Sequence, residues 1–212
     1  MFAFLGSLTD AAVALVATYP SAALAVTFAA AIIEAVAVLG ILIPGTPIVM
    51  AVAGAAAMAG HSMLPYIVLA ILGAVIGDFI SFWFGSYYRD ELRRMWPFSK
   101  RPTLMESATA FFDRYGVYSV ALCRLIPVLR STVPLVAGMA GMNRRKFVIA
   151  NVASAVVWGP AHVYPAALAG LSIESMRAGD WNAAALWATV FAGCILAGWM
   201  LHHMVIRRRR QA

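Results

Sequence analysis

The sequence predicts an all-α integral membrane protein, an inverted repeat with two opposed re-entrant helical hairpins among about three full transmembrane spans. Three observations support this class. Hydrophobic residues make up 63% of the 212 residues and charged residues only 12%, whereas soluble domains are about 25% charged. Several apolar stretches are long enough to cross a bilayer. Two of the stretches are broken by proline and glycine in similar patterns.

Residues 1–21 are expected to form an N-terminal helix that lies at the membrane interface or crosses the membrane, and that ends near Tyr19 and Pro20. No basic residue precedes Tyr19 and no convincing cleavage site follows it. The segment is therefore interpreted as retained and not as a signal peptide. Residues 22–206 are expected to form a single membrane domain.

The first interrupted stretch is apolar over residues 22–43 and carries one carboxylate, Glu34, well inside it. Pro44 and Gly45 then break the helix, because proline cannot continue the hydrogen-bond ladder. Such a break within membrane sequence is tolerated where protein or a cavity surrounds it. The pattern predicts a re-entrant hairpin over residues 34–60.

Residues 64–88 form the clearest full crossing. A helix of about 25 residues is roughly 37 Å long, enough to cross about 30 Å of hydrocarbon. Asp78 follows Gly77 within this span, and a small residue allows another helix to approach closely. Residues 89–114 are rich in arginine and lysine, which predicts a cytoplasmic loop.

The second interrupted stretch contains two arginines, two prolines and a glycine: Arg124, Pro127, Arg130, Pro134 and Gly138. An arginine at the bilayer centre costs roughly 2.5–3.5 kcal/mol, and a proline inside a helix roughly 3 kcal/mol. A straight helix through lipid is therefore disfavoured. Because basic residues flank the stretch on both sides, it is predicted to enter and leave on the cytoplasmic side, as a re-entrant hairpin over residues 118–143.

Further spans are expected over residues 147–171 and 183–206, joined by a nearly neutral segment on the outer face. Residues 207–212 include four consecutive arginines at their start and are expected to form a basic cytoplasmic tail. The prediction is a multi-pass protein whose C-terminus is cytoplasmic.

The two interrupted stretches are alike. Leu42 to Gly54 reads LIPGTPIVMAVAG, and Leu125 to Gly138 reads LIPVLRSTVPLVAG. One crossing and one loop separate them, so they would open toward opposite faces of the membrane, as in an inverted repeat. Chance recurrence of proline and glycine is the alternative. The repeat is favoured because intramembrane charges fall at both breaks.

The net charge of +7 would suit nucleic acid, but the basic residues collect at the ends of apolar segments, where they set topology. No nucleic-acid partner is expected. The sequence offers no metal-ligand spacing and no nucleophile–base set, so no metal, cofactor, catalytic residue or enzymatic activity is expected. Membrane lipids are the expected partners, and a homo-oligomer is left open.

Three groups of residues carry a family resemblance: Glu34 with Ile43-Pro44-Gly45, the run GDFISFWFG that opens on Gly77-Asp78, and the pattern R-x-x-P-x-x-R-x-x-x-P-x-x-A-G that begins at Arg124. Phe147, Asn151 and Trp158 complete the pattern. Over roughly residues 28–170 the chain resembles the DedA family of bacterial membrane proteins, which is related to the VTT domain of eukaryotic lipid scramblases.

The resemblance implies two opposed re-entrant hairpins and transport of lipid phosphates, notably the return of undecaprenyl phosphate across the bacterial inner membrane, coupled to the proton gradient. Many members carry Asp or Glu just after the Pro-Gly pair, where this chain has Thr46. A threonine hydroxyl can hydrogen-bond a phosphate but cannot carry a proton at physiological pH. Proton coupling through two carboxylates in the first hairpin is therefore in doubt.

Arg124, Arg130 and Thr46 are expected to bind the substrate phosphate, because the break between the two arginines lets both guanidinium groups converge. Glu34 and Asp78 are expected to couple protons. An apolar setting favours the protonated carboxyl, and a nearby arginine favours the ionised one. The alternative is that these charges only neutralise one another, with Asp78 serving helix packing.

The remaining site residues are structural or mixed in expected role. Pro44, Gly45, Pro127, Pro134 and Gly138 are expected to shape the hairpins. Asn151 and Trp158 are expected at a helix interface or in the site itself. Other functions left open are a cation/proton antiporter in which Glu34 and Asp78 bind the cation, a general phospholipid scramblase, and a non-transporting membrane scaffold.

Overall fold

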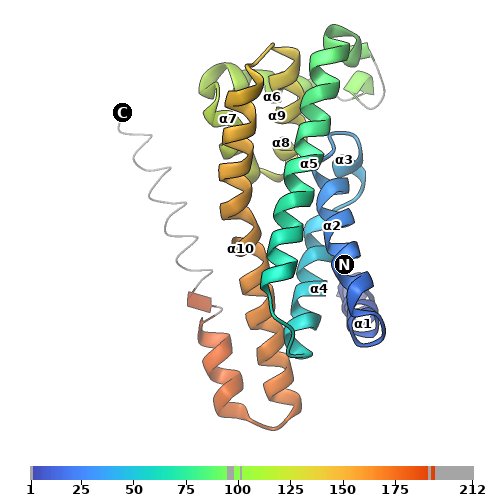
Figure 1. Cartoon of the computed structure of the whole chain (residues 1–212), viewed down its shortest axis with the longest axis vertical. Coiled ribbons are helices and arrows are strands. Elements are labelled where there is room, and N and C mark those ends of the chain that lie inside the picture. Colours follow the sequence, from blue (N-terminus) through green and yellow to red (C-terminus); the bar gives the residue numbers. More distant parts are fainter. Residues whose placement is uncertain (1, 95–97, 101, 191, 194–212) are drawn as a thin grey trace.

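The computed structural model describes residues 2–94, 98–100, 102–190 and 192–193, and every regular element in these ranges is helical (Figure 1). This confirms the predicted all-α class. Residues 181–190, at the start of the expected last span, are helical. The rest of that span beyond residue 193, and the expected basic tail over residues 207–212, lie outside the described residues.

The elements follow one another in this order: α1 (Phe2–Thr18), α2 (Pro20–Ala35), α3 (Leu39–Leu42), α4 (Gly45–Met58), α5 (Leu64–Tyr88), η1 (Arg89–Arg94), η2 (Phe98–Lys100), α6 (Pro102–Tyr115), α7 (Tyr118–Leu122), η3 (Cys123–Leu125), α8 (Pro127–Arg130), α9 (Thr132–Met139) and α10 (Arg144–Arg177).

Two of these helices, α5 and α10, are long and apolar enough to cross a membrane. Helix α5 has the predicted bounds. Helix α10 begins at Arg144, before the predicted residue 147, because the Asn143 side chain caps it by accepting hydrogen bonds from the backbone N–H groups of Arg145 (2.9 Å) and Lys146 (3.4 Å).

The first interrupted stretch breaks earlier than the prolines suggest. Helix α2 ends at Ala35, directly after Glu34, and Val36 is extended. The Ser81 hydroxyl of α5 lies at the opened backbone: it accepts from the Ala37 N–H (2.9 Å), and its single proton lies between the Ala35 and Gly77 carbonyl oxygens (3.1 Å each). A buried serine therefore fixes the position of the break.

After the break, α3 makes a single turn and an extended Pro44 leads into α4, which packs back against α2 and α1. The second interrupted stretch runs through α7, η3, α8 and α9, with an extended Ile126 before Pro127. In Figure 1 both breaks lie toward the middle of the long axis, and the two stretches return to opposite ends of the molecule.

Helix α5 connects the two stretches, because α2 and α9 both pack on it. At the α5–α9 crossing the backbones nearly touch: a Cβ added at Gly138 would lie 2.1 Å from the Phe82 carbonyl oxygen, and one added at Gly85 would lie 2.0 Å from that of Leu135. Only glycine allows this approach, which confines α9 to one position on α5.

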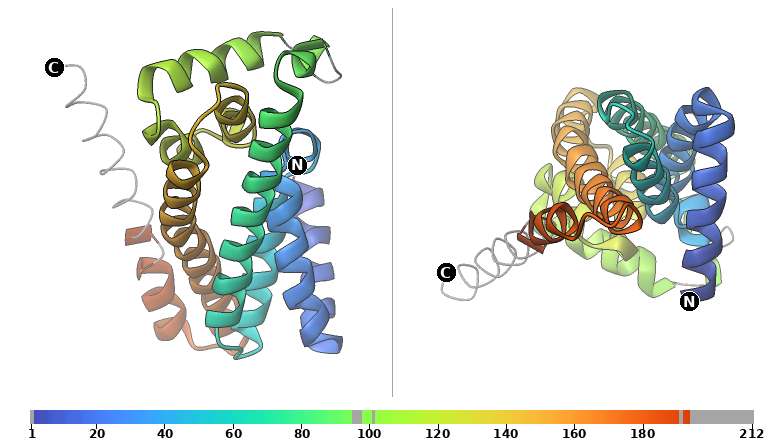
Figure 2. Two further views of the ribbon diagram at one scale, coloured as in Figure 1. Left: turned by 45° about the horizontal axis from the view of Figure 1, so that its top comes forward. Right: turned by 90° about the horizontal axis from the view of Figure 1, so that it is seen from below.

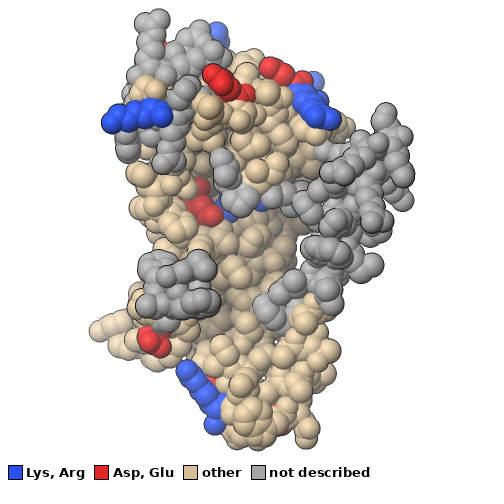
Figure 3. Space-filling model, turned by 180° about the vertical axis from the view of Figure 1, so that it is seen from behind, with Lys and Arg blue, Asp and Glu red and all other residues tan. Residues whose placement is uncertain are grey.

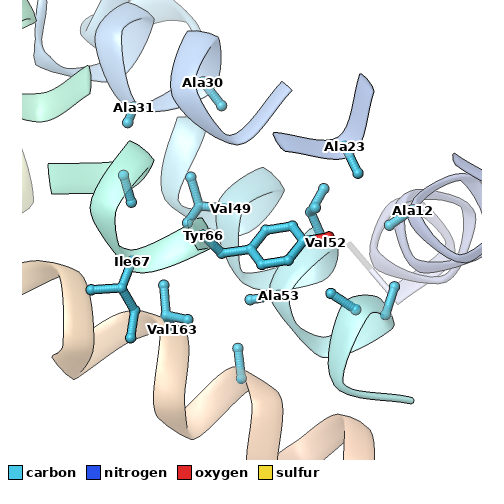
Figure 4. Close-up of a cluster of buried hydrophobic side chains, with 14 of the residues drawn as sticks. Ala12, Ala23, Ala30, Ala31, Val49, Val52, Ala53, Tyr66, Ile67 and Val163 are labelled. Carbon is cyan, nitrogen blue, oxygen red and sulfur yellow. The ribbon is translucent and has the colours of Figure 1, made fainter. Parts of the chain in front are cut away.

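The core is built mainly of small residues. In the cluster of Figure 4, alanines of α1, α2 and α4 surround Val49 and Val52 of α4, Tyr66 and Ile67 of α5, and Val163 of α10. Small side chains let the helices pack closely where lipid surrounds the bundle. A second cluster, which includes Cys123, Leu129 and Leu135, packs under η1 and α6.

Charged side chains gather mainly toward the two ends of the molecule in Figure 3, with a broad uncharged band between them. Helix α6 lies across one end of the bundle (Figure 2). A small group of acidic and basic atoms interrupts the uncharged band about halfway along (Figure 3).

Replacing Gly138 by alanine is expected to lower the free energy of unfolding by about 1–3 kcal/mol, the usual effect of overpacking. The clash with a backbone carbonyl outweighs the 0.5–1 kcal/mol, roughly, that alanine gains over glycine within a helix. Thermal unfolding of the purified protein measures the change. Ala110→Val, on the exposed face of α6, is the control and should stay within about 0.5 kcal/mol of wild type. Equal stability of Gly138→Ala and wild type would contradict the close crossing.

Candidate functional site

Broken helices bring four charged side chains together in the interior. Glu34 lies in the last turn of α2, Asp78 lies within α5, Arg124 lies in η3 and Arg130 ends α8. Both arginines and Asp78 are buried. We call these four residues the charge cluster. Because each comes from a different element, the cluster forms only when both interrupted stretches are in place.

The first ion pair joins Arg124 to Asp78, with Nη2 2.5 Å from Oδ2, and each side chain is only 4% exposed. The same Nη2 donates to Asn151 Oδ1 (2.8 Å), and Nε donates to Ser154 Oγ (2.8 Å). Asn151 is itself held by its Nδ2, which donates to the Val75 carbonyl (3.1 Å). Arg124 is thus fixed by α5 and α10 together.

The second ion pair joins Arg130 to Glu34, with Nη1 3.0 Å from Oε1. Thr46 lies between them: its hydroxyl is 2.7 Å from both Glu34 carboxylate oxygens and donates its single proton to the carboxylate, and it accepts from Arg130 Nη1 (3.0 Å). The Glu34 side chain is 15% exposed, more than any other member of the charge cluster. This pair is the more accessible of the two.

The short distance from Glu34 to Thr46 depends on Gly45. A Cβ added at this position would lie 2.3 Å from the Ala30 carbonyl oxygen and 2.8 Å from Glu34 Cβ. The first turn of α4 therefore packs directly on the last turns of α2.

Trp158 of α10 lies beside both arginines. Its ring centroid is 4.3 Å from Arg130 Cζ and 5.8 Å from Arg124 Cζ, within the range of cation–π contact. Two guanidinium groups six positions apart would diverge on a straight helix. Here both lie beside one indole ring because η3 and α8 are separated by the extended Ile126.

Several polar atoms of the charge cluster have no hydrogen-bond partner among the described residues: Asp78 Oδ1, Arg124 Nη1, and Arg130 Nε and Nη2. Buried donors of this kind are costly unless something binds them. Nε and Nη2 of Arg130 lie along one edge of the planar guanidinium, and such an edge matches two oxygens of a phosphate or carboxylate.

The structure brings together all seven side chains that the sequence singled out for binding, proton coupling or helix contact: Glu34, Thr46, Asp78, Arg124, Arg130, Asn151 and Trp158. Among the predicted shaping residues, Pro127 starts α8 and Pro134 is buried within α9. No group of three or more metal-ligating side chains occurs in the part of the chain that the structure describes.

Two site residues were not predicted. Ser154 binds Arg124, and Ser81 holds the break after Glu34. A spacing of three residues relates Ser81 to Asp78 and Ser154 to Asn151, which places each serine on the same helix face as a predicted residue. This spacing of three residues was the sequence signal that could have identified the two serines as site residues.

Known proteins resemble this chain over most of its length. The VTT domain matches residues 43–168. Inner membrane protein YabI of Escherichia coli (strain K12) is 31% identical over 175 residues, which cover 80% of this chain and 67% of YabI. Protein DedA of the same strain is 31% identical over 94 residues, covering 43% of this chain and 42% of DedA. An uncharacterized membrane protein of Buchnera aphidicola subsp. Acyrthosiphon pisum is 28% identical over 143 residues, covering 67% and 56%. No solved structure matches.

Two apolar helices long enough to span a bilayer, with paired charges among broken helices, are consistent with a helical membrane protein. The match to the VTT domain extends over more than half of the chain, and the chain therefore belongs to the DedA family of membrane proteins. It spans 67% of the length of YabI and 56% of that of the Buchnera relative.

Replacing Asp78 by asparagine is expected to lower the free energy of unfolding by about 3–5 kcal/mol, because Arg124 keeps a buried charge without its counter-ion. Arg124→Gln should lower the free energy of unfolding by a similar amount, because Asp78 then keeps a buried negative charge without its counter-ion. The double variant should be destabilised by clearly less than the sum, and thermal unfolding of all four proteins measures the coupling. Strictly additive losses would show that the two side chains do not interact.

Proposed function

We propose that this chain carries an anionic lipid phosphate across the bacterial inner membrane, as in the return of undecaprenyl phosphate, and that the proton-motive force drives the movement. The observation that carries the proposal is the edge of Arg130 formed by Nε and Nη2, buried and unpaired among the described residues. A phosphate group supplies the two oxygens that fit this edge.

The proposal includes a topology. Residues 34–60 and 118–143 would be re-entrant hairpins of an inverted repeat, opening to opposite faces, with α5 and α10 as full spans and the expected last span returning the C-terminus to the cytoplasm. Residues 89–114, rich in arginine, would be cytoplasmic, so the second hairpin would open inward. The position of both breaks near the middle of the long axis supports this reading (Figure 1).

In this mechanism Arg130 binds the phosphate through its free edge, and Arg124 adds its free Nη1. The Thr46 hydroxyl, now bonded to Glu34 and Arg130, can turn to donate to a phosphate oxygen. Both ion pairs are the resting state, and substrate would compete with Glu34 for Arg130.

In this mechanism, the net charge of the charge cluster links phosphate binding to proton uptake. The charge cluster has two arginines and two carboxylates, and so is neutral when all are ionised. A phosphate that enters adds negative charge in a low-dielectric setting, which is strongly unfavourable unless a proton or a cation accompanies it. Glu34, at 15% side-chain exposure against 4% for Asp78, is the more accessible carboxylate for that proton.

Transport of labelled undecaprenyl phosphate into right-side-out and inside-out proteoliposomes, with and without a proton gradient, tests the proposal. Directional uptake that needs the gradient supports it. Gradient-independent equilibration of ordinary phospholipids would instead indicate a scramblase. Cation–proton exchange whose rate is unchanged by added polyprenyl phosphate would indicate an antiporter. The absence of any flux would favour a non-transporting scaffold.

Arg130→Lys is expected to lower the transport rate about tenfold or more, equivalent to about 1.4 kcal/mol or more, although the charge is kept. Lysine offers a single ammonium and cannot reproduce the two-atom edge. Initial rates in proteoliposomes measure the effect, and Arg145→Lys at the exposed start of α10 is the matched control. Wild-type rates in Arg130→Lys would remove Arg130 from the phosphate site.

Glu34→Gln is expected to leave transport insensitive to an imposed proton gradient, because glutamine has a similar shape and cannot ionise. The measured quantity is the ratio of transport rates with and without the gradient. Glu106→Gln, on the exposed face of α6, is the control and should keep the wild-type ratio. If Glu34→Gln also kept it, protons would be coupled elsewhere.

A further inference from the structure

A cavity of about 390 Å³ lies between α10 and the α7–η3 segment, next to the charge cluster. Its walls include Ala121 and Leu122 on one side and Val157 and Ala161 on the other, and its polar lining includes Arg124 and Ser154. We call this cavity the lateral groove. It is separate from the Arg130–Glu34 pair, since neither of those two residues lines it.

Among the residues that the structure describes, the lateral groove is open at the surface of the bundle. Ala153, Val157 and Ala161 follow one face of α10 at a spacing of four residues, and all three are exposed. From Ala153 to His162 this face extends roughly 14 Å along the helix axis. Val157 is 70% exposed. In a membrane, this opening would face hydrocarbon.

The inner part of the lateral groove is charged. Arg124 lines it with a side chain that is only 4% exposed, and its Nη1 is buried without a partner among the described residues. Trp158 also lines the groove and contacts Arg130 through the same indole ring. An apolar channel that opens toward lipid and ends on a buried cation complements an amphiphile with an anionic head.

We propose that the lateral groove binds the hydrocarbon chain of a lipid phosphate, next to the head group, while the phosphate contacts Arg124. The inference rests on the proposed function and extends it, because it assigns the path by which substrate enters from the bilayer. Lipid selection would then depend on the chain as well as on the phosphate.

Photo-crosslinking of the full chain in phosphatidylcholine nanodiscs tests the inference. The probe is a polyprenyl phosphate with a diazirine in the chain close to the phosphate, and the comparison probe is the corresponding neutral polyprenol. The phosphate probe should label Leu122, Val157 and Ala161, and the alcohol should label them several-fold less. Equal labelling by both probes would overturn the inference, as would labelling confined to Ile149 and Val156, exposed residues of α10 outside the groove.

A groove-filling variant gives a second, independent readout. Ala161→Trp should reduce both groove labelling and transport several-fold, while Val156→Trp, at an exposed position outside the groove, should leave both unchanged. Thermal unfolding separates this effect from misfolding. Wild-type labelling in a stable Ala161→Trp would also overturn the inference.

The two proposals fail in different ways. If wild type transports lipid phosphate and Ala161→Trp does so equally well, the lateral groove is not on the path, and the proposed function stands. If wild type transports no lipid but still shows phosphate-dependent labelling of the groove, the binding site stands and the proposed transport fails.

Discussion

Mutual neutralisation of four charges, three of them buried and Glu34 partly buried, is the constraint on which the rest of this structure depends. A single uncompensated charge in such surroundings costs several kcal/mol. Arg124 is held by Asp78 at 2.5 Å, and Arg130 by Glu34 at 3.0 Å. Because the four residues come from α2, α5, η3 and α8, the ion pairs connect both interrupted stretches to the central helix. The same two ion pairs therefore both stabilise the fold and form the candidate site.

The breaks that expose these charges also open the backbone, and the structure satisfies it with side chains. Ser81 bonds to both sides of the break after α2, and Gly45 and Gly138 let neighbouring backbones approach closely enough to exclude other atoms. Irregular backbone inside a helical membrane protein is tolerated where protein encloses it. Small residues, as well as prolines, thus determine the positions of Glu34 and Arg130.

The sequence was sufficient to predict the helical class and the bounds of α5, and it singled out seven side chains that the structure places close together, because apolar length and charges within apolar segments are local signals. It could not predict which carboxylate pairs with which arginine, since that depends on how α2 and α9 cross α5. The sequence also could not predict that α2 ends at Ala35. Ser81, whose hydroxyl contacts the Ala35 carbonyl, is 46 residues away along the chain, and no local sequence pattern predicts a contact at that separation.

Thr46 shows how one position sets the electrostatics of the site. The family resemblance leads one to expect an acid here, and an acid would give the charge cluster an excess negative charge beside Glu34. Threonine instead donates to Glu34 and accepts from Arg130, so the two pairs balance. Under the transport mechanism that we propose, a phosphate entering this balanced cluster adds negative charge that proton uptake would offset. Thr46 cannot ionise, so in that mechanism the proton goes to Glu34 or Asp78, of which Glu34 is the more exposed.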